Sequence, residues 1–400
     1  MKKLDIPFGR PWIANEDRKA VMDVLKGHIL THGPNCTAFE DEFIAMMGGG
    51  FATSTSSCMA ALHLSYLHFG LGPDDEVIVP AMTHVATVHA VALTGATPVF
   101  VDCELQSGNM DLNRIEDAVT PRTRALSVVH FCGIPCAMPD VMRLADHYGL
   151  RVIEDCALAV GARYDGRHVG LFGHTGCYSF YPVKHITTGE GGMLVSQYED
   201  IVGAISRFRA FNVDRSHTEH TIPGIYDVTG VGMNYRMSEM QAALGRTQVK
   251  KIPEITKRRA NNFKALKEGL LAIEGVSVLD ATDDLALNSH YCLVAVLSGE
   301  LARRRDDLVR ALNERGVGTS IYYPHPVPRL SHYRTKYGYD SALYPGAETI
   351  SDHSIALPVG PHLTTKDMAY IAKAFSAAVS GKTRKPAKKA PGKKPRAKKK

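Results

Sequence analysis

The chain has 400 residues, of which 44% are hydrophobic and 22% are charged, a length and composition typical of a globular protein with two domains. These values exclude a disordered chain, and no apolar run approaches the roughly 20 residues that cross a bilayer. The net charge of +6 is concentrated at one end, because residues 382–400 hold 11 of the 47 Lys and Arg residues and no acidic residue.

Residues 381–400 have too little apolar surface to fold, and we expect them to form a disordered Lys-rich tail. Binding to nucleic acid would depend on this tail alone, since the rest of the chain has 36 basic and 41 acidic residues. A tail that meets anions and a tail that is merely solvated are equally consistent with the sequence.

The first residues, MKKLDIPFGRPW, contain two lysines but no apolar segment behind them, so we expect no signal peptide and a cytoplasmic location. The eight cysteines lie mostly in apolar, strand-like segments, as reduced and buried thiols do. Cys132 and Cys136 form a lone pair with no second ligand pair nearby, which makes a zinc site a weak hypothesis.

Short β-rich runs alternate with helical stretches between residues 50 and 200. The runs predict buried strands at Val77–Val79, Pro98–Val101, Ala125–Phe131, Val152–Ile153, Cys177–Phe180 and Met193–Val195. The helical stretches are Ala86–Leu93, Leu112–Ala118 and Asp140–Tyr148. This alternation is typical of a mostly parallel α/β sheet, in which ligands bind at the carboxyl ends of the strands.

The second half of the chain predicts a binding loop and a smaller domain. Residues 211–230 show no periodicity, which is typical of a lid or binding loop. A long helical stretch begins after Asn234 and continues beyond Pro253, where it should link two domains. The remaining α+β segment has a strand at His290–Val296 and helices at Leu301–Arg315 and Lys366–Val379. We expect an arm at 1–15, a large domain at 16–250 and a small domain at 251–380.

Two residues stand where a ligand should bind. Lys184 lies in CYSFYPVKHITTGEGGM, between a β-rich run and a Gly-rich turn. Asp155 ends the run RVIED, which places its carboxylate at the carboxyl edge of the sheet; a helix cap is the equally supported alternative. A buried carboxylate needs a cationic or hydrogen-bonding partner, and the protonated pyridine nitrogen of pyridoxal phosphate would supply one.

A Ser/Thr cluster leads directly into an apolar helix in TSTSSCMAALHLSYL. The free amides and the dipole at such a helix start favour a phosphate. The signal is weak by itself, because Ser and Thr are also the ordinary N-caps.

Taken together, these segments resemble the DegT/StrS sugar-nucleotide aminotransferases, including perosamine-synthase-like enzymes. The resemblance extends from Ile6 to Val379, in the order ILTHGP, TSSCMAALHL, DEVIVPAMTHVAT, GATPVFVD, RVIEDCALAVGA, SFYPVKHITTGEGGM, GMNYRMSEMQAALG, GVGTSIYYPHPVP and ALPVGPHLT. It implies the α/β fold of fold-type I pyridoxal-phosphate enzymes, with a mostly parallel seven-stranded sheet in the large domain and a smaller α+β C-terminal domain.

The resemblance also implies roles for residues around the cofactor ring. Lys184 would form an imine with pyridoxal 5'-phosphate and later move the proton, and Asp155 would pair with the pyridine nitrogen. His84 falls where the family stacks an aromatic ring on the cofactor.

Other matching positions imply the phosphate site and a dimer. Ser57, the amides of Cys58 and Met59, and the hydroxyl of Ser179 would hold the phosphate. Asn234 and Arg236 match a block that reaches the neighbouring subunit's phosphate in the family, which implies a homodimer with shared active sites.

Three departures from the family pattern stand out. Cys58 and Met59 replace a small residue followed by Thr, so one hydroxyl to the phosphate is missing. Leu158 replaces His or Gln, a usual partner of the cofactor's phenolic oxygen. His84 in place of Phe, Tyr or Trp is the mildest change. We expect the chemistry to survive, because Lys184 and Asp155 are both present.

The implied reaction moves an amino group from L-glutamate to a nucleotide-linked keto sugar, by resemblance a 4-keto-6-deoxy hexose, with a 3-keto sugar as an alternative. Residues 211–230 and Tyr322–His325 would wall the sugar site. Alternatives are a pyridoxal-phosphate sugar dehydratase and a non-catalytic regulatory protein that binds the cofactor. The related dehydratases have histidine where this chain has Lys184, so the sequence favours amino transfer.

Overall fold

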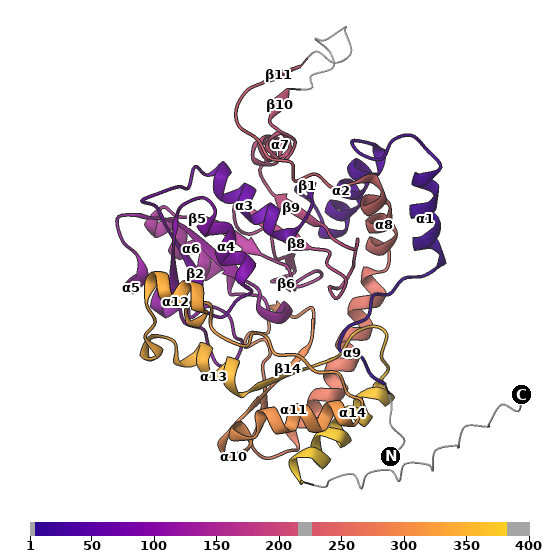
Figure 1. Cartoon of the computed structure of the whole chain (residues 1–400), viewed down its shortest axis with the longest axis vertical. Coiled ribbons are helices and arrows are strands. Elements are labelled where there is room, and N and C mark those ends of the chain that lie inside the picture. The colour runs from indigo at the N-terminus through magenta and orange to yellow at the C-terminus, as the bar shows by residue number, and fades with distance from the viewer. Residues whose placement is uncertain (1–4, 215–225, 382–400) are drawn as a thin grey trace, which may run out of the picture.

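The computed structural model describes residues 5–214 and 226–381. It has two lobes, and Figure 1 shows the large sheet with α3, α4 and α6 in one and α9, α11 and α14 in the other. The expected tail, and most of the expected loop at 211–230, lie outside the described residues. Among the described residues, no helix has both the length and the apolar character needed to span a membrane.

A seven-stranded sheet forms the centre of the large lobe. Its strand order is β1-β9-β8-β5-β4-β2-β3, and β9 alone runs antiparallel to its neighbours. The strands are β1 Phe51–Thr55, β2 Glu76–Pro80, β3 Thr97–Val101, β4 Thr123–Val129, β5 Arg151–Asp155, β8 Thr175–Ser179 and β9 Gly192–Ser196. The mostly parallel seven-stranded sheet predicted from the sequence is confirmed.

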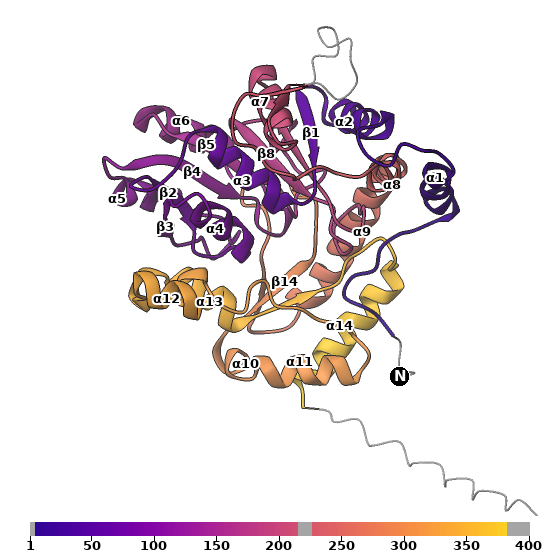
Figure 2. The ribbon, with the colours of Figure 1, turned by 45° about the horizontal axis from the view of Figure 1, so that its top comes forward.

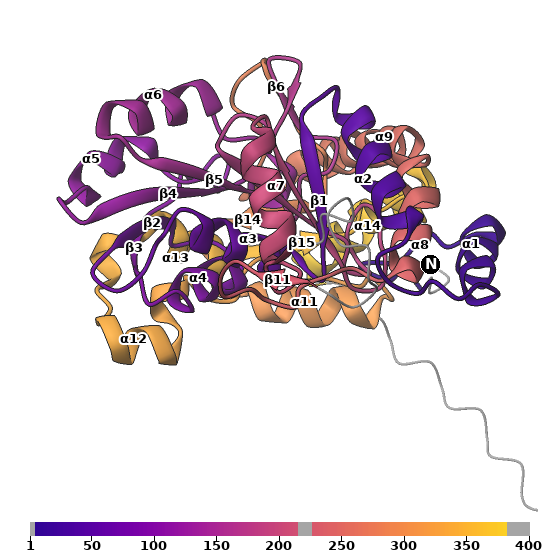
Figure 3. The ribbon, with the colours of Figure 1, turned by 90° about the horizontal axis from the view of Figure 1, so that it is seen from above.

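Helices cover both faces of this sheet, as Figure 3 shows. Because side chains alternate along a strand, Val77 and Val79 face α3 and α4, whereas Ile78 faces the side of α6. The helices of this lobe are α1 Asn15–Leu25, α2 Pro34–Met47, α3 Cys58–His68, α4 Val85–Ala92, α5 Ile115–Ala118, α6 Met138–Tyr148, α7 Glu199–Phe208 and α8 Glu239–Val249. Short strands outside the main sheet are β6 Arg163–Tyr164, β7 Arg167–His168, β10 Val213–Asp214, β11 Asp227–Val228 and β13 Ala286–Leu287.

The C-terminal lobe has its own hydrophobic core beneath a three-stranded antiparallel sheet, ordered β12-β14-β15. Its strands are β12 Val276–Val278, β14 Leu293–Leu297 and β15 Ser354–Leu357, and its helices are α9 Ile252–Leu271, α10 Gly299–Arg303, α11 Arg305–Glu314, α12 Ser331–Tyr337, α13 Pro345–His353 and α14 Thr365–Val379. Figure 2 shows α9 rising from this lobe toward α8. This core supports the division that we propose near residue 250, and a further buried cluster, which includes Phe131 and Tyr291, joins the two lobes.

The N-terminal segment belongs to the core of the C-terminal lobe. Ile6 is buried there, its N–H donates to the Gly316 carbonyl at 2.8 Å, and its carbonyl accepts from the Gly318 N–H at 2.7 Å. The first described residues therefore complete a core built mainly from residues after 251.

Several expected elements have different limits in the structure. The strand expected at Ala125–Phe131 ends at Val129, because Phe131 starts the 3-10 turn η2, Phe131–Gly133, in which Cys132 has φ 51°. The strand expected from His290 starts at Leu293, since His290 has φ 53°. The helix expected at Leu301–Arg315 divides at Arg304 into α10 and α11. The stretch expected at Leu112–Ala118 is a 3-10 turn, η1 Leu112–Arg114, followed by one turn of α-helix.

The carboxylate of Glu154 organises the turn that follows β7. It accepts from the N–H groups of Gly170, Phe172 and Gly173 at 2.6–2.9 Å and lies 3.0 Å from Nε2 of His130. These bonds use the carboxylate oxygens that a cation would need, which explains the close approach of His130, Glu154 and Cys156 without a metal. All eight cysteines are free thiols.

Candidate active site

A cavity of about 240 Å³ opens at the carboxyl ends of β4, β5 and β8, beside the N-terminus of α3. This is the edge of the sheet at which the sequence predicts a ligand. Seven of the nine predicted site residues line it, and they are Ser57, Cys58, Met59, His84, Asp155, Ser179 and Lys184.

Asp155 ends β5 and is only 4% exposed. One carboxylate oxygen accepts from Thr87 Oγ1 at 2.7 Å, and the other accepts from the Ala157 N–H at 3.0 Å. Within residues 5–214 and 226–381, Asp155 takes part in no ion pair of 4 Å or less. A buried carboxylate held only by neutral donors favours a cation in the cavity. Thr87, on α4, was not predicted from the sequence.

Lys184 lies in the turn after β8, where its N–H donates to the Tyr181 carbonyl at 2.9 Å. Its ammonium is 5.4 Å from the centre of the Tyr291 ring. Burial lowers the pKa of Lys184 from its usual value, while Cys58 and Asp155 act in the opposite direction. A lysine with a lowered pKa has a larger neutral fraction near neutral pH, and only the neutral amine is a nucleophile or a base.

The lowered pKa of Lys184 predicts a pH-dependent effect on stability. A lysine whose pKa is lower in the folded than in the unfolded protein binds fewer protons when folded, so stability rises with pH up to about 10, the unfolded pKa. Lys184→Met should therefore make the apoprotein more stable than wild type at pH 7, by a margin that narrows toward pH 10. Urea denaturation at several pH values measures this margin. A margin that does not change with pH would contradict the prediction.

The start of α3 is built to receive an anion. Ser57 is its N-cap, and Ser57 Oγ accepts from the Ala60 N–H at 3.1 Å. The first amides of the helix, those of Cys58 and Met59, have no partner within the helix. A Cβ on Gly192 would lie 2.5–2.6 Å from the backbone of Ser57 and Cys58, so only glycine lets β9 approach the helix start this closely. Ser179, at the end of β8, completes the cradle.

His84 and Leu158 form another part of the cavity wall. His84 is the N-cap of α4: its Nδ1 accepts from the Ala86 N–H at 3.2 Å, and its ring packs against Tyr323 at 5.5 Å between centres. Burial, followed by the charge of Lys184, lowers the pKa of His84. The neutral ring offers a flat face to a ligand. Leu158 is buried and adds only apolar surface.

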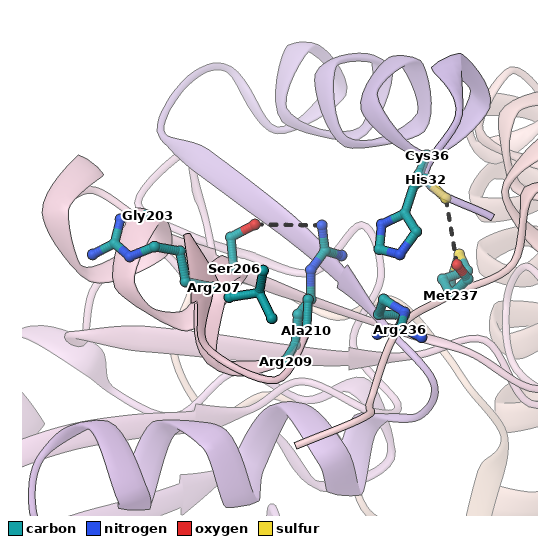
Figure 4. A pocket seen from close by; sticks show the side chains of 10 residues that line it. His32, Cys36, Gly203, Ser206, Arg207, Arg209, Ala210, Arg236 and Met237 are labelled. Carbon is teal, nitrogen blue, oxygen red and sulfur yellow. Dashed lines mark hydrogen bonds between the residues drawn. The ribbon is translucent and has the colours of Figure 1, made fainter. Parts of the chain in front are cut away.

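Asn234 and Arg236 do not line the Lys184 cavity. Arg236 lines a second cavity of about 440 Å³, together with His32, Arg207 and Arg209 (Figure 4). The Arg236 guanidinium lies 4.8 Å from the centre of the Phe211 ring. Asn234 pairs with Ala210 through an isolated backbone bridge. Within one chain, the structure therefore separates these two residues from the other seven predicted site residues.

The structure describes only some of the residues expected to wall the sugar site. Tyr323 lines the Lys184 cavity, and the hydroxyls of Tyr322 and Tyr291 lie 2.7 Å apart. Of the segment 211–230, the structure describes the two short strands β10 and β11, which pair with each other. Residues 215–225, between these strands, lie outside the described residues. Tyr291, which contacts Lys184, was not predicted from the sequence, because it is far from Lys184 along the chain.

Comparisons with known proteins agree with this geometry. Residues 11–376 match the DegT/DnrJ/EryC1/StrS aminotransferase family. The chain belongs to this family. It is 33% identical to the spore coat polysaccharide biosynthesis protein SpsC of Bacillus subtilis strain 168, over 94% of this chain and 97% of SpsC. This aminotransferase is therefore a pyridoxal-phosphate-dependent enzyme of fold-type I.

Solved structures of this family superpose closely on the chain. DesV of S. venezuelae, solved with a ketimine intermediate, has a TM-score of 0.84 and 32% identity over 91% of this chain and 94% of DesV. The PLP form of the putative sugar aminotransferase Spr1654 of Streptococcus pneumoniae has a TM-score of 0.88 and 25% identity over 95% of this chain and all of Spr1654.

The residues of the Lys184 cavity fit the cofactor. Asp155 offers a buried carboxylate without a cationic partner, α3 offers unpaired amides, and Lys184 offers an amine of lowered pKa. When bound, pyridoxal phosphate supplies an electron sink that stabilises a carbanion next to nitrogen.

Proposed function

We propose that this aminotransferase transfers the amino group of L-glutamate to a nucleotide-linked keto sugar, with a 4-keto-6-deoxy hexose as the preferred acceptor. The observation that carries the proposal is the placement of Lys184, with its lowered pKa, in one cavity with the buried Asp155 carboxylate and the start of α3. The similarity to SpsC, named for polysaccharide biosynthesis, and to a putative sugar aminotransferase supports a sugar as acceptor.

Each group in the cavity has a part in this chemistry. Lys184 Nζ takes the proton from the α-carbon of the donor and later delivers a proton to the sugar carbon, a role that needs a neutral amine. Asp155 keeps a positive charge on the pyridine nitrogen, and Thr87 fixes the direction of that carboxylate. The amides of Cys58 and Met59 hold the phosphate with Ser57 and Ser179.

The reaction can be tested with purified enzyme, L-glutamate and 4-keto-6-deoxy sugars linked to GDP, dTDP or UDP. We expect an amino sugar and an equal amount of 2-oxoglutarate, both measured by mass spectrometry. The corresponding 3-keto sugars serve as matched acceptors that differ only in the reacting carbon. A deoxygenated keto sugar with release of ammonia from every substrate would instead show dehydration, and binding without any product would show a regulatory protein.

We propose that two chains form a homodimer in which each completes the other's active site. Apolar side chains near the Arg236 cavity support a covered face, since Tyr226 is 61% exposed, Val228 50% and Val231 85%. In this arrangement Asn234 and Arg236 reach the phosphate held by the partner. The eight free thiols support the proposed cytoplasmic location.

Mixing two inactive variants tests the shared site. Arg236→Ala and Lys184→Ala should each be inactive alone, but a mixed dimer has one site with both defects and one with neither. Random pairing should then restore about a quarter of the wild-type activity, because half of the dimers are mixed. Co-expression with two affinity tags, followed by sedimentation and an activity assay, measures this. An active monomer, or mixed dimers without activity, would contradict the shared site.

A further inference from the structure

A third cavity, of about 740 Å³, lies on the opposite side of the sheet from α3 and α4. It is formed where the end of α2, the β6–β7 hairpin and the first turns of α9 meet residues 287–290. Figure 3 shows α2, β6 and α9, which contribute to this side. Among the described residues, the lining of this third cavity includes none of the nine predicted site residues and none of the residues that line the Lys184 cavity.

The charged side chains of this cavity are all basic. Arg163, Lys250 and Lys257 line it, and none of the lining residues in the described part of the chain is Asp or Glu. None of these three cations takes part in an ion pair within the described residues. Glu254 lies close enough to Lys257 for the charge of Lys257 to contribute to lowering the Glu254 pKa, but it does not line the cavity. Three cations on a cavity wall that carries no acidic side chain attract an anion.

A buried imidazole, that of His168, lines the cavity. His168 ends β7 and is 4% exposed, yet neither ring nitrogen has a hydrogen bond of normal geometry. The Met46 and Ala162 carbonyls lie near the ring, and burial, followed by the charge of Arg163, lowers the pKa of His168 to about 4. These carbonyls do not meet the geometry of a normal hydrogen bond, and a polar group of a ligand would improve on them.

The rest of the lining is largely apolar, with Met46, Val249, Ile252, Pro253 and Leu287 among the contributors. An inorganic anion would leave this surface uncovered, whereas an anion with an apolar body would bury it. We propose that this cavity is a second ligand site, and that it takes an organic anion whose phosphate or carboxylate meets Lys250, Lys257 and Arg163 while its apolar body contacts α9.

The wall of this site continues into the neighbourhood of Lys184. Ser289 lines the cavity, and its carbonyl lies 3.0 Å from Nε2 of His185, the residue after Lys184. The Ser289 hydroxyl also donates to the carbonyl of Leu158, which lines the Lys184 cavity. Two residues further along the chain, Tyr291 contacts the Lys184 ammonium. A ligand that holds Ser289 therefore changes the surroundings of the catalytic lysine.

Calorimetry of the holoenzyme tests the site with two probes. Adenosine monophosphate represents phosphate-bearing anions, and 2-naphthoate represents carboxylate-bearing anions. Lys257→Glu reverses one charge of the site, and Ala260→Phe fills it without changing charge. Lys264→Glu, an exposed position two turns further along α9 that does not line the cavity, is the matched control. Circular dichroism establishes that each variant is folded.

We expect at least one probe to bind wild type and Lys264→Glu alike, and to bind Lys257→Glu and Ala260→Phe at least about tenfold more weakly. Which of the two probes binds shows whether the site prefers a phosphate or a carboxylate. Saturation should also shift the pH midpoint of the cofactor absorbance in wild type but not in Lys257→Glu. Equal affinity in all four proteins, or no binding of either probe, would overturn the site. Binding without a shift would overturn its connection to Lys184.

Discussion

Replacement of Lys184 with alanine should reduce turnover at least about 10³-fold, because it removes both the covalent attachment of the cofactor and the base that moves the proton. Lys184→Arg should be almost as inactive, since a guanidinium stays protonated at neutral pH and cannot act as a base. Formation of 2-oxoglutarate from L-glutamate, followed over a single turnover, measures the loss.

Chemical labelling makes the same assignment independently of turnover. Borohydride reduction of the wild-type holoenzyme followed by peptide mapping should place the cofactor on Lys184. Lys264→Ala, which removes an exposed lysine of α9, is the control and should keep both the label and the activity. A label on another lysine, or substantial turnover by Lys184→Ala, would disprove the assignment.

Asp155→Asn should lower turnover about 10²- to 10³-fold. An opposite charge at close range shifts a pKa, here that of the pyridine nitrogen, by about 1–3 units, and the variant loses this charge while it keeps the shape of the side chain. Leu158→His should cost or gain only about 0.5–1.5 kcal/mol, the usual value of one hydrogen bond, and should shift the pH titration of the cofactor absorbance. Comparison of kcat and of the absorbance titration for the two variants tests the difference in role.

Thr87→Val is the matched control for the Asp155 variant. It removes the 2.7 Å hydrogen bond to the carboxylate but leaves its charge in place, so its loss of turnover should be smaller than that of Asp155→Asn. Losses of equal size in Asp155→Asn and Leu158→His would show that the charge of Asp155 is not what matters.

The sheet and the catalytic edge were predictable because their signals are local. EVIVP has apolar residues on both faces and RVIED has a buried Val-Ile pair, so both are recognisable as strands. The parallel strands end at the same edge, where Asp155 ends β5 and Lys184 follows β8. β1 was missed because its sequence, FATST, contains polar β-branched residues and small residues in place of an apolar run. Its strand conformation depends on pairing with β9.

The rest of the candidate site depends on contacts between distant segments. Thr87 reaches Asp155 across 68 positions of the chain, and Tyr291 comes to Lys184 from the C-terminal lobe. Periodicity and motif spacing do not indicate which residues from distant segments of the chain come into contact. The separation of Arg236 from the Lys184 cavity depends in the same way on how the segment after β11 folds back, so the roles of Asn234 and Arg236 remain predictions.

The placement of Ile6 in the C-terminal core has a consequence for synthesis of the protein. Its two backbone bonds join it to Gly316 and Gly318, segments that leave the ribosome more than 300 residues after it. The arm must therefore remain unattached during most of translation, and the C-terminal lobe cannot close its core until both ends of the chain have been made. Contacts this far apart in sequence slow folding. Because Ile6 also fills part of the C-terminal core, removal of the first residues should prevent the lobe at the other end of the chain from completing that core.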